Sequence, residues 1–169
     1  MNDVHDLQLA RFSRPVAVEF IDTRTVADGL YRKYRYVAAG DEGVSQSMHV
    51  QRDWLVRGRK CVFSDELKDE ELAYISTSNE NHEKLQHARR ALELDFVAFD
   101  YSYDRDGELI VWEANPYPYL HFSKGNRRYR LASLERVLAA IVKLYLLESG
   151  LPVHARIDEF LDESALRPN

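Results

Sequence analysis

The sequence predicts a single α+β domain in which helices pack on an antiparallel sheet. Runs rich in aromatic and β-branched residues form two hairpin-like pairs, at 31–50 and at 95–115. Apolar residues with helical spacing follow each pair, at 79–94 and at 131–148. Strands grouped into hairpins with helices between and after them are typical of an α+β layer architecture.

Composition limits the classes of protein to consider. The chain has 169 residues, of which 45% are hydrophobic, enough for one core in one domain. A net charge of −5 disfavours sequence-independent binding to nucleic acid. Cys61 is the single cysteine, which excludes an internal disulfide and fits a reducing compartment. Because no segment resembles an export signal or a membrane span, we expect a cytoplasmic protein with neither nucleic acid nor membrane as partner.

The chain is expected to divide into three parts. Residues 1–14 are polar and mixed, and they predict a lead-in segment. Residues 15–130 form the main subdomain, and 131–169 form helices that pack on the same domain. The first element of the subdomain is a strand at 16–21, which the polar connection 22–29 ends.

The first hairpin has clear signals. Residues 31–39 are rich in aromatic and β-branched side chains, residues 40–43 supply a glycine-containing turn, and 44–50 return as the partner strand. Residues 51–77 predict irregular structure. The acidic stretch 65–71 within them predicts a solvated surface.

Three helices are expected, at 79–94, at 131–148 and at about 155–161. Asn79 or Asn81 can cap the first, since asparagine is a favoured N-cap residue. Gly150 ends the second, a strongly apolar amphipathic helix. The loop 119–130 carries four basic residues and is expected to face solvent.

Two carboxylates and a carboxamide stand inside the otherwise apolar second hairpin. Asp106 and Gly107 are a strong turn signal, and a two-residue turn there puts Asp100 directly opposite Glu113. A four-residue loop would instead make these acids diagonal neighbours on the same face. Asn115 shares that face, because side chains alternate along a strand.

The apolar surroundings make these acids informative. Apolar residues on both faces predict strands that are covered on both sides. Two buried acids at one place imply a cation, a shared proton or open solvent. Oxygen ligands of this type suit Mg²⁺ or Mn²⁺. The alternative is that both acids lie at a wet sheet edge and bind nothing.

With these residues the chain resembles the C-terminal subdomain of the ATP-grasp superfamily, whose Mg²⁺-dependent ligases typically join a carboxylate to an amine through an acyl phosphate. In that family an aspartate ends one hairpin strand and the returning strand carries Glu-x-Asn-x-x-Pro. Here these are Asp100 and Glu113-Ala-Asn115-Pro-Tyr-Pro118. The resemblance implies a fold like the C-terminal ATP-grasp lobe, with ATP as cofactor and Asp100, Glu113 and Asn115 as metal ligands.

Two further segments carry the resemblance. The sequence 18–22 looks like the family's hinge strand, which borders adenine. The resemblance therefore implies that the nucleotide-binding residues are Glu19, Phe20, Ile21 and Asp22. The strand 31–37 resembles the family's strand with a phosphate- or substrate-facing arginine, and Arg35 fits that position. Arg35 would be the catalytic residue that stabilises charge on the transferring phosphoryl group or the acyl phosphate.

The sequence also departs from the family. ATP-grasp enzymes clamp the nucleotide between two lobes, and the first lobe supplies a glycine-rich loop that this chain lacks. Lys33 stands where some relatives carry an aspartate. We therefore expect the ATP/Mg-binding half of a carboxylate–amine ligase, weak or inactive as an isolated chain. It would bind a nucleotide and a small-molecule carboxylate, with a separate N-terminal lobe or a second copy as partner.

Two other functions remain open. A non-catalytic, degenerate ATP-grasp module would act through a partner chain or through self-association. Its candidate contacts are the aromatic residues Tyr31, Tyr34, Tyr36, Tyr117, Tyr119 and Phe122. A metal-dependent nuclease also uses paired acids, but such enzymes commonly place a lysine where this chain has Asn115, and the acidic balance disfavours a phosphate-rich polymer.

Overall fold

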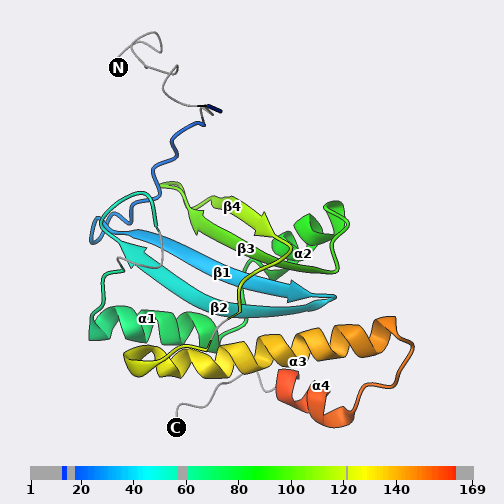
Figure 1. The fold of residues 1–169 in the computed structure, drawn as a ribbon. Coiled ribbons are helices and arrows are strands. Elements are labelled where there is room, and N and C mark those ends of the chain that lie inside the picture. The colour runs from blue at the N-terminus through cyan, green and yellow to red at the C-terminus, as the bar shows by residue number, and fades with distance from the viewer. Residues whose placement is uncertain (1–12, 15–17, 57–60, 121, 163–169) are drawn as a thin grey trace.

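The computed structural model describes residues 13–14, 18–56, 61–120 and 122–162. They form an antiparallel sheet of four strands in the order β2-β1-β3-β4 (Figure 1). The strands are β1 (Tyr31–Ala39), β2 (Glu42–Gln51), β3 (Phe96–Tyr103) and β4 (Leu109–Asn115). The α-helices of the described residues are α1 (Asp65–Ser76), α2 (His82–Ala91), α3 (Leu131–Glu148) and α4 (Ala155–Asp162), and a 3₁₀ helix, η3 (Gly125–Arg130), precedes α3. The predicted α+β class with an antiparallel sheet is confirmed.

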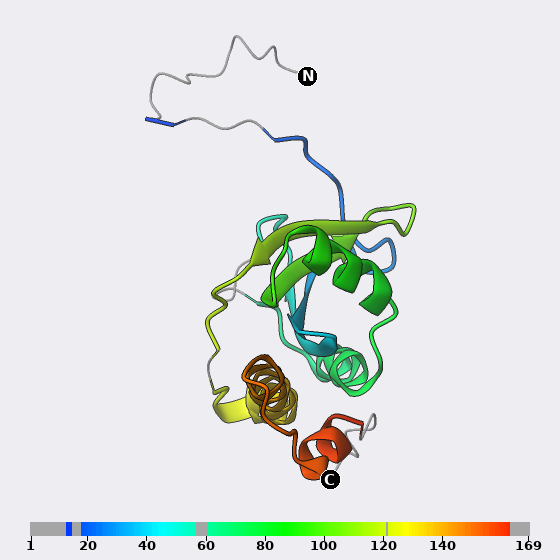
Figure 2. The ribbon, with the colours of Figure 1, turned by 90° about the vertical axis from the view of Figure 1, so that its right-hand side faces the viewer.

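Helices cover both faces of the sheet (Figures 1 and 2). Alternate residues of β1 point to opposite sides, as the pleat of a strand requires. Tyr36 and Ala38 pack with Leu85 of α2, whereas Val37 packs with Val137 of α3. The core therefore consists of two layers, one on each side of β1 and β3.

All three expected helices form, as α2, α3 and α4. Asn81 precedes α2 as expected, but its side chain makes no capping hydrogen bond. It is buried and donates instead to the Tyr103 hydroxyl at 2.6 Å. None of the described helices is both long and apolar enough to cross a membrane.

The second hairpin brings Asp100 opposite Glu113, as predicted, but by a different route. Its turn occupies residues 104–108 rather than two residues. A β-bulge in β4 then leaves Trp112 without a partner in the ladder, and this extra residue restores the expected register.

The prediction that both strands of this hairpin are covered on both sides is wrong for β4. Val97 and Phe99 of β3 are buried, whereas Val111 and Trp112 of β4 are exposed. The strand order explains the difference, because β3 lies between two strands and β4 is the edge of the sheet. Apolar composition alone did not distinguish the central strand from the edge strand.

The prediction of irregular structure at 51–77 is wrong for α1. Ser64 caps this helix by accepting a hydrogen bond from the backbone N–H of Leu67. Asp65 and Glu66 occupy its first turn, where negative side chains stabilise the helix by interacting with the positive end of its dipole. Ser64, as an N-cap residue, therefore indicates α1 more clearly than the apolar periodicity of the segment, which its many charged residues obscure.

The acidic stretch of α1 and the basic loop 119–130 are not simply solvated, because Glu71 and Arg130 form a buried ion pair. Glu71 is 3% exposed and Arg130 is 8% exposed, and Nε of Arg130 lies 2.7 Å from Oε1 of Glu71. The pair covers the outer edge of β2: Glu71 accepts from the Met48 N–H at 2.8 Å, and Arg130 donates to the Met48 carbonyl at 2.9 Å.

The strand predicted at 16–21 does not form in the part of it that is described. Residues 15–17 lie outside the described residues, and 18–21 belong to no strand. Val18 and Phe20 are exposed. A strand needs a neighbour for its backbone groups, and this segment leads away from the sheet (Figures 1 and 2).

Candidate functional site

The three predicted metal ligands lie on one face of the sheet. Asp100 pairs with Glu113 across β3 and β4, and Asn115 pairs with Ala98. Ala98 packs in the same cluster as Val137 of α3. Because side chains alternate along each strand, Asp100, Glu113 and Asn115 lie on the face of the sheet that α3 partly covers.

Asp100 and Glu113 line an open cavity of about 320 Å³. Lys33 and Trp112 also reach it from the sheet, and Trp54 reaches it from the loop after β2. Both tryptophans of the chain therefore border the same cavity. One part of its wall is charged and another is aromatic.

Asp100 is held by two cations from the neighbouring strand β1. Its side chain is buried, with the residue 2% exposed. Arg35 lies directly opposite it in the ladder and donates from Nε to Oδ1 at 2.6 Å and from Nη2 to Oδ2 at 2.9 Å. Lys33, two residues along the same strand face, donates from Nζ to Oδ2 at 2.7 Å.

This pairing determines the charge state of the acid. Burial by itself raises the pKa of Asp100, but the hydrogen bonds and charges of Arg35 and Lys33 outweigh it, so the pKa lies below the usual value. Burial likewise lowers the pKa of Arg35, and Asp100 and Glu113 more than offset that effect. Asp100 and Arg35 are therefore both charged at neutral pH.

The predicted ligand set does not fit a bare metal ion in this arrangement. Both oxygens of Asp100 are engaged, and the Asn115 side-chain oxygen accepts from the backbone N–H of Tyr117 at 2.8 Å. Glu113 is exposed and keeps its oxygens available. A metal ion at Asp100 would also lie beside two positive charges. Within the described residues, no three His, Cys, Asp or Glu side chains group closely enough to hold a metal.

Sequence reasoning gave Lys33 no clear role, although one signal was present. Lys33 and Arg35 are two residues apart on a strand, and this spacing places both on one face. His49 pairs with Lys33 across β1 and β2. Burial, helped by Arg130 and by Lys33, lowers the pKa of His49 to about 3. The imidazole is therefore neutral at pH 7.

None of the four expected nucleotide-binding residues, all of them described, lines the cavity. Glu19 and Phe20 are exposed, and Ile21 and Asp22 are half-buried. The Phe20 ring meets Trp54 edge-on, with ring centroids 6.1 Å apart. Asp22 instead pairs with Arg24 and with Arg105 of the β3–β4 turn, each at 2.6 Å. Its hydrogen bonds with Arg24 lower its pKa most strongly.

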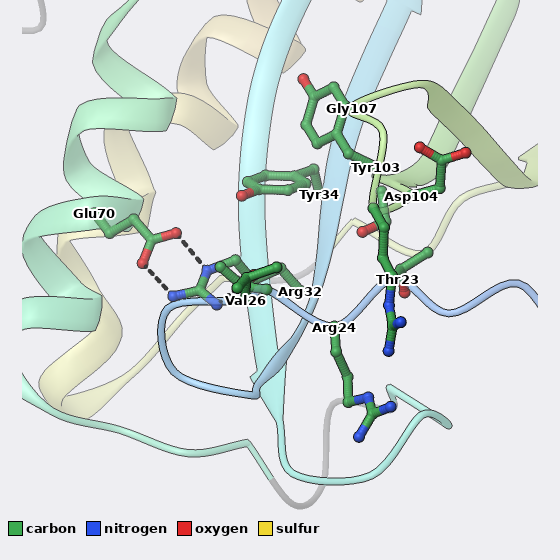
Figure 3. Close-up of a pocket in the computed structure, with 12 residues that line it drawn as sticks. Thr23, Arg24, Val26, Arg32, Tyr34, Glu70, Tyr103, Asp104 and Gly107 are labelled. Carbon is green, nitrogen blue, oxygen red and sulfur yellow. Dashed lines mark hydrogen bonds and ion pairs between the residues drawn. The ribbon is translucent and has the colours of Figure 1, made fainter.

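A second cavity, of about 460 Å³, lies between α1, the loop 23–26 and the β3–β4 turn (Figure 3). None of the predicted site residues lines it. Arg32 pairs there with Glu70 of α1, with Nε 2.6 Å from Oε1. All three arginines that line it, Arg24, Arg32 and Arg105, already pair with carboxylates. Lys33 and Arg32, which line the smaller cavity, are paired with carboxylates in the same way.

Comparison with known proteins gives no match: no family model fits the chain, and no curated protein or solved structure resembles it significantly. The likeness to the ATP-grasp superfamily consequently rests on the residues quoted above.

Proposed function

We propose that this chain is the ATP-binding half of an ATP-grasp carboxylate–amine ligase and that Lys33 and Arg35 bind the phosphate groups of the nucleotide. The observation that carries the proposal is the convergence of these two cations on Asp100, on one sheet face beside an open cavity that Lys33, Asp100 and Glu113 line. Phosphate groups bind most strongly to charged donors, and a guanidinium can engage two oxygens at once.

The two cations have different roles in this proposal. Arg35 has a planar fork that suits the spread charge of a transferring phosphoryl group, which makes it the catalytic residue. Lys33 acts as a point charge beside it. The aromatic part of the cavity supports a nucleotide base, since Trp54 and Trp112 offer ring faces or edges and Phe20 contacts Trp54.

Catalysis also needs a cover over the site. Phosphoryl transfer depends on positioning and on exclusion of water, whereas Phe20, Trp54 and Trp112 leave apolar surface exposed around the cavity. A partner lobe that covers this surface would complete the clamp and bring a small-molecule carboxylate to the phosphates. The isolated chain is therefore expected to bind nucleotide but to turn it over weakly.

Tryptophan fluorescence tests the proposal directly, because both tryptophans border the cavity. Titration of the full chain with Mg²⁺–ATP should give a saturable change in emission. Arg35→Met should weaken binding about tenfold or more, since a hydrogen bond to a charged group contributes about 1.5–3 kcal/mol. The matched control is Arg90→Met, at an exposed position on α2. An unresponsive native chain, or equal weakening by both variants, would contradict the proposal.

One observation favours the alternative, a non-catalytic module that acts by association. Three of the candidate contact residues, Tyr117, Tyr119 and Phe122, are 90%, 78% and 64% exposed in the segment after β4, whereas Tyr31 and Tyr36 are buried. Exposed aromatic residues grouped along one segment are typical of interaction surfaces. Light scattering that gives the monomer mass over a wide concentration range would count against self-association.

A further inference from the structure

A third cavity, of about 130 Å³, lies where the connection between α1 and α2 meets the sheet. Its wall includes Tyr74 of α1, Asn79 and Glu80 of the connection, and Tyr101 and Tyr103 of β3. Of the described residues that line it, Glu80 is the one with a charged side chain. The two larger cavities have lysine or arginine in their walls, so this cavity differs from them in presenting a carboxylate without a cation.

This cavity is separate from the phosphate site proposed above. Tyr101 follows Asp100 on β3, and consecutive side chains of a strand point to opposite faces. Tyr101 accordingly packs in the core cluster that contains Leu85 of α2. Neither Lys33 nor Arg35 is among the residues that line the cavity. A ligand bound there is therefore independent of the proposed function.

The hydrogen bonds of the three tyrosine hydroxyls have a fixed direction, because carbonyl and carboxylate oxygens only accept. Tyr74 donates to the Arg35 carbonyl at 3.0 Å. Tyr103 donates to Oε1 of Glu80 at 2.6 Å. The Tyr101 hydroxyl in turn donates to that of Tyr74 at 3.3 Å. All three phenolic protons are engaged, so these residues offer a ligand oxygen lone pairs and no donor.

Asn79 uses its donors within the wall as well. Its amide nitrogen donates to the hydroxyls of Ser45 and Tyr101, each at 3.0 Å. Its carbonyl oxygen accepts from the Asn81 N–H at 2.9 Å, which fixes the orientation of the amide. The second carboxylate oxygen of Glu80 has no hydrogen-bond partner among the residues that the structure describes. The wall therefore offers mainly acceptors, and the strongest of them belongs to an acid.

The tyrosine rings also suit a positive charge. The rings of Tyr101 and Tyr103 stand at 89° with their centroids 5.9 Å apart, and they form a corner of the wall. A cation is attracted to the face of an aromatic ring. Burial raises the pKa of Tyr103, and the hydrogen bond to Glu80 raises it further, so this phenol is neutral at pH 7. Burial likewise raises the pKa of Tyr74.

We propose that this cavity binds a small primary amine in its protonated form. An alkylammonium ion has three N–H donors and no acceptor, which matches a wall whose own donors are engaged. One N–H donates to the free oxygen of Glu80 and another to the Tyr101 hydroxyl, while the alkyl group lies against the rings of Tyr101 and Tyr103. An anion would be repelled by Glu80, and a neutral alcohol would lack the charge.

Two-dimensional NMR of the full chain tests the proposal by comparing ethylammonium, tetramethylammonium, potassium ion and ethanol as titrants at constant ionic strength. Ethylammonium should shift the backbone amide signals of residues 78–81 and of Tyr101 in a saturable manner. Ethanol lacks the charge and tetramethylammonium lacks N–H donors, so each should bind at least tenfold more weakly. Potassium ion should leave these signals in place.

Glu80→Gln removes the charge but keeps an acceptor for the Tyr103 hydroxyl, and it should weaken ethylammonium binding about tenfold. The matched control is Glu135→Gln, at an exposed position of α3, which should bind as the native chain does. Absence of a saturable shift with ethylammonium, an equal response to ethanol or potassium ion, or an unchanged affinity in Glu80→Gln would overturn the proposal. The comparison of titrants uses the native chain and does not depend on how the variants fold.

Discussion

Glu71→Gln is expected to lower the free energy of unfolding by about 3 kcal/mol, because removing one charge of a buried ion pair typically costs about 3–5 kcal/mol. Glu71 and Arg130 are both buried, and the carboxylate receives four contacts. They are Nε of Arg130 at 2.7 Å, Nη2 of Arg130 at 2.8 Å, the Tyr129 hydroxyl at 2.5 Å and the Met48 N–H at 2.8 Å.

Glutamine retains one acceptor oxygen, which places the expected cost at the lower end of that range. Its amide group, however, turns a donor toward Arg130 or Tyr129, which are donors themselves. Removing both charges should not restore stability, because the Met48 N–H and carbonyl on the edge of β2 would then lose their partners. Each unsatisfied buried group costs about 1–3 kcal/mol.

Urea denaturation followed by tryptophan fluorescence measures this change. With an unchanged slope of about 1–3 kcal/mol per molar urea, the loss corresponds to a fall in the midpoint of about 1 M or more. Glu159→Gln, an exposed position on α4, is the matched control and should leave the midpoint in place. A loss of less than about 1 kcal/mol for Glu71→Gln would refute the reasoning.

Two further predictions concern stability. Burial, with Arg130, holds the pKa of His49 at about 3 instead of its usual 6.5, so the unfolded chain gains the proton first as the pH falls. Stability from this group is therefore complete above pH 6.5 and lost toward pH 3, and it should be about 2 kcal/mol lower at pH 5 than at pH 8. His49→Gln should flatten that dependence in urea denaturation, and an unchanged pH profile would speak against it. Gly43→Ala would press a methyl group onto the Tyr36 hydroxyl, which lies 2.7 Å from Nδ1 of His82. Overpacking of about 2 kcal/mol should lower Tm by about 5 °C in a thermal melt, and an unaltered Tm would disprove the close contact.

Patterns of residues close together in the sequence were sufficient to predict much of the fold and part of the candidate site. Period-2 alternation and a turn signal predicted that Asp100 faces Glu113, and a bulge at Trp112 preserved that register although the turn was longer than expected. Helical periodicity predicted the helices after each hairpin, where apolar residues recur on one side. These features depend on residues close together in the chain.

The missed features depend on residues far apart. The partners of Asp100 became evident only from the strand order, which sets β1 beside β3 and brings Lys33 and Arg35 to it. The pair of Glu71 with Arg130 likewise joins two segments that charge patterns alone assigned to solvent. No local period encodes which strand is central or which opposite charges meet across the core.

Nitrogen NMR of the arginine Nε–H groups during a titration with Mg²⁺–ATP tests the central claim most directly, since Nε of Arg35 bonds to Asp100 in the free protein. If Arg35 exchanges this partner for a phosphate, its Nε–H resonance should move in proportion to saturation. The resonance of Arg89, which bonds to Gln86 of α2, should stay in place. An Arg35 resonance that remains unmoved at saturating nucleotide would contradict the account.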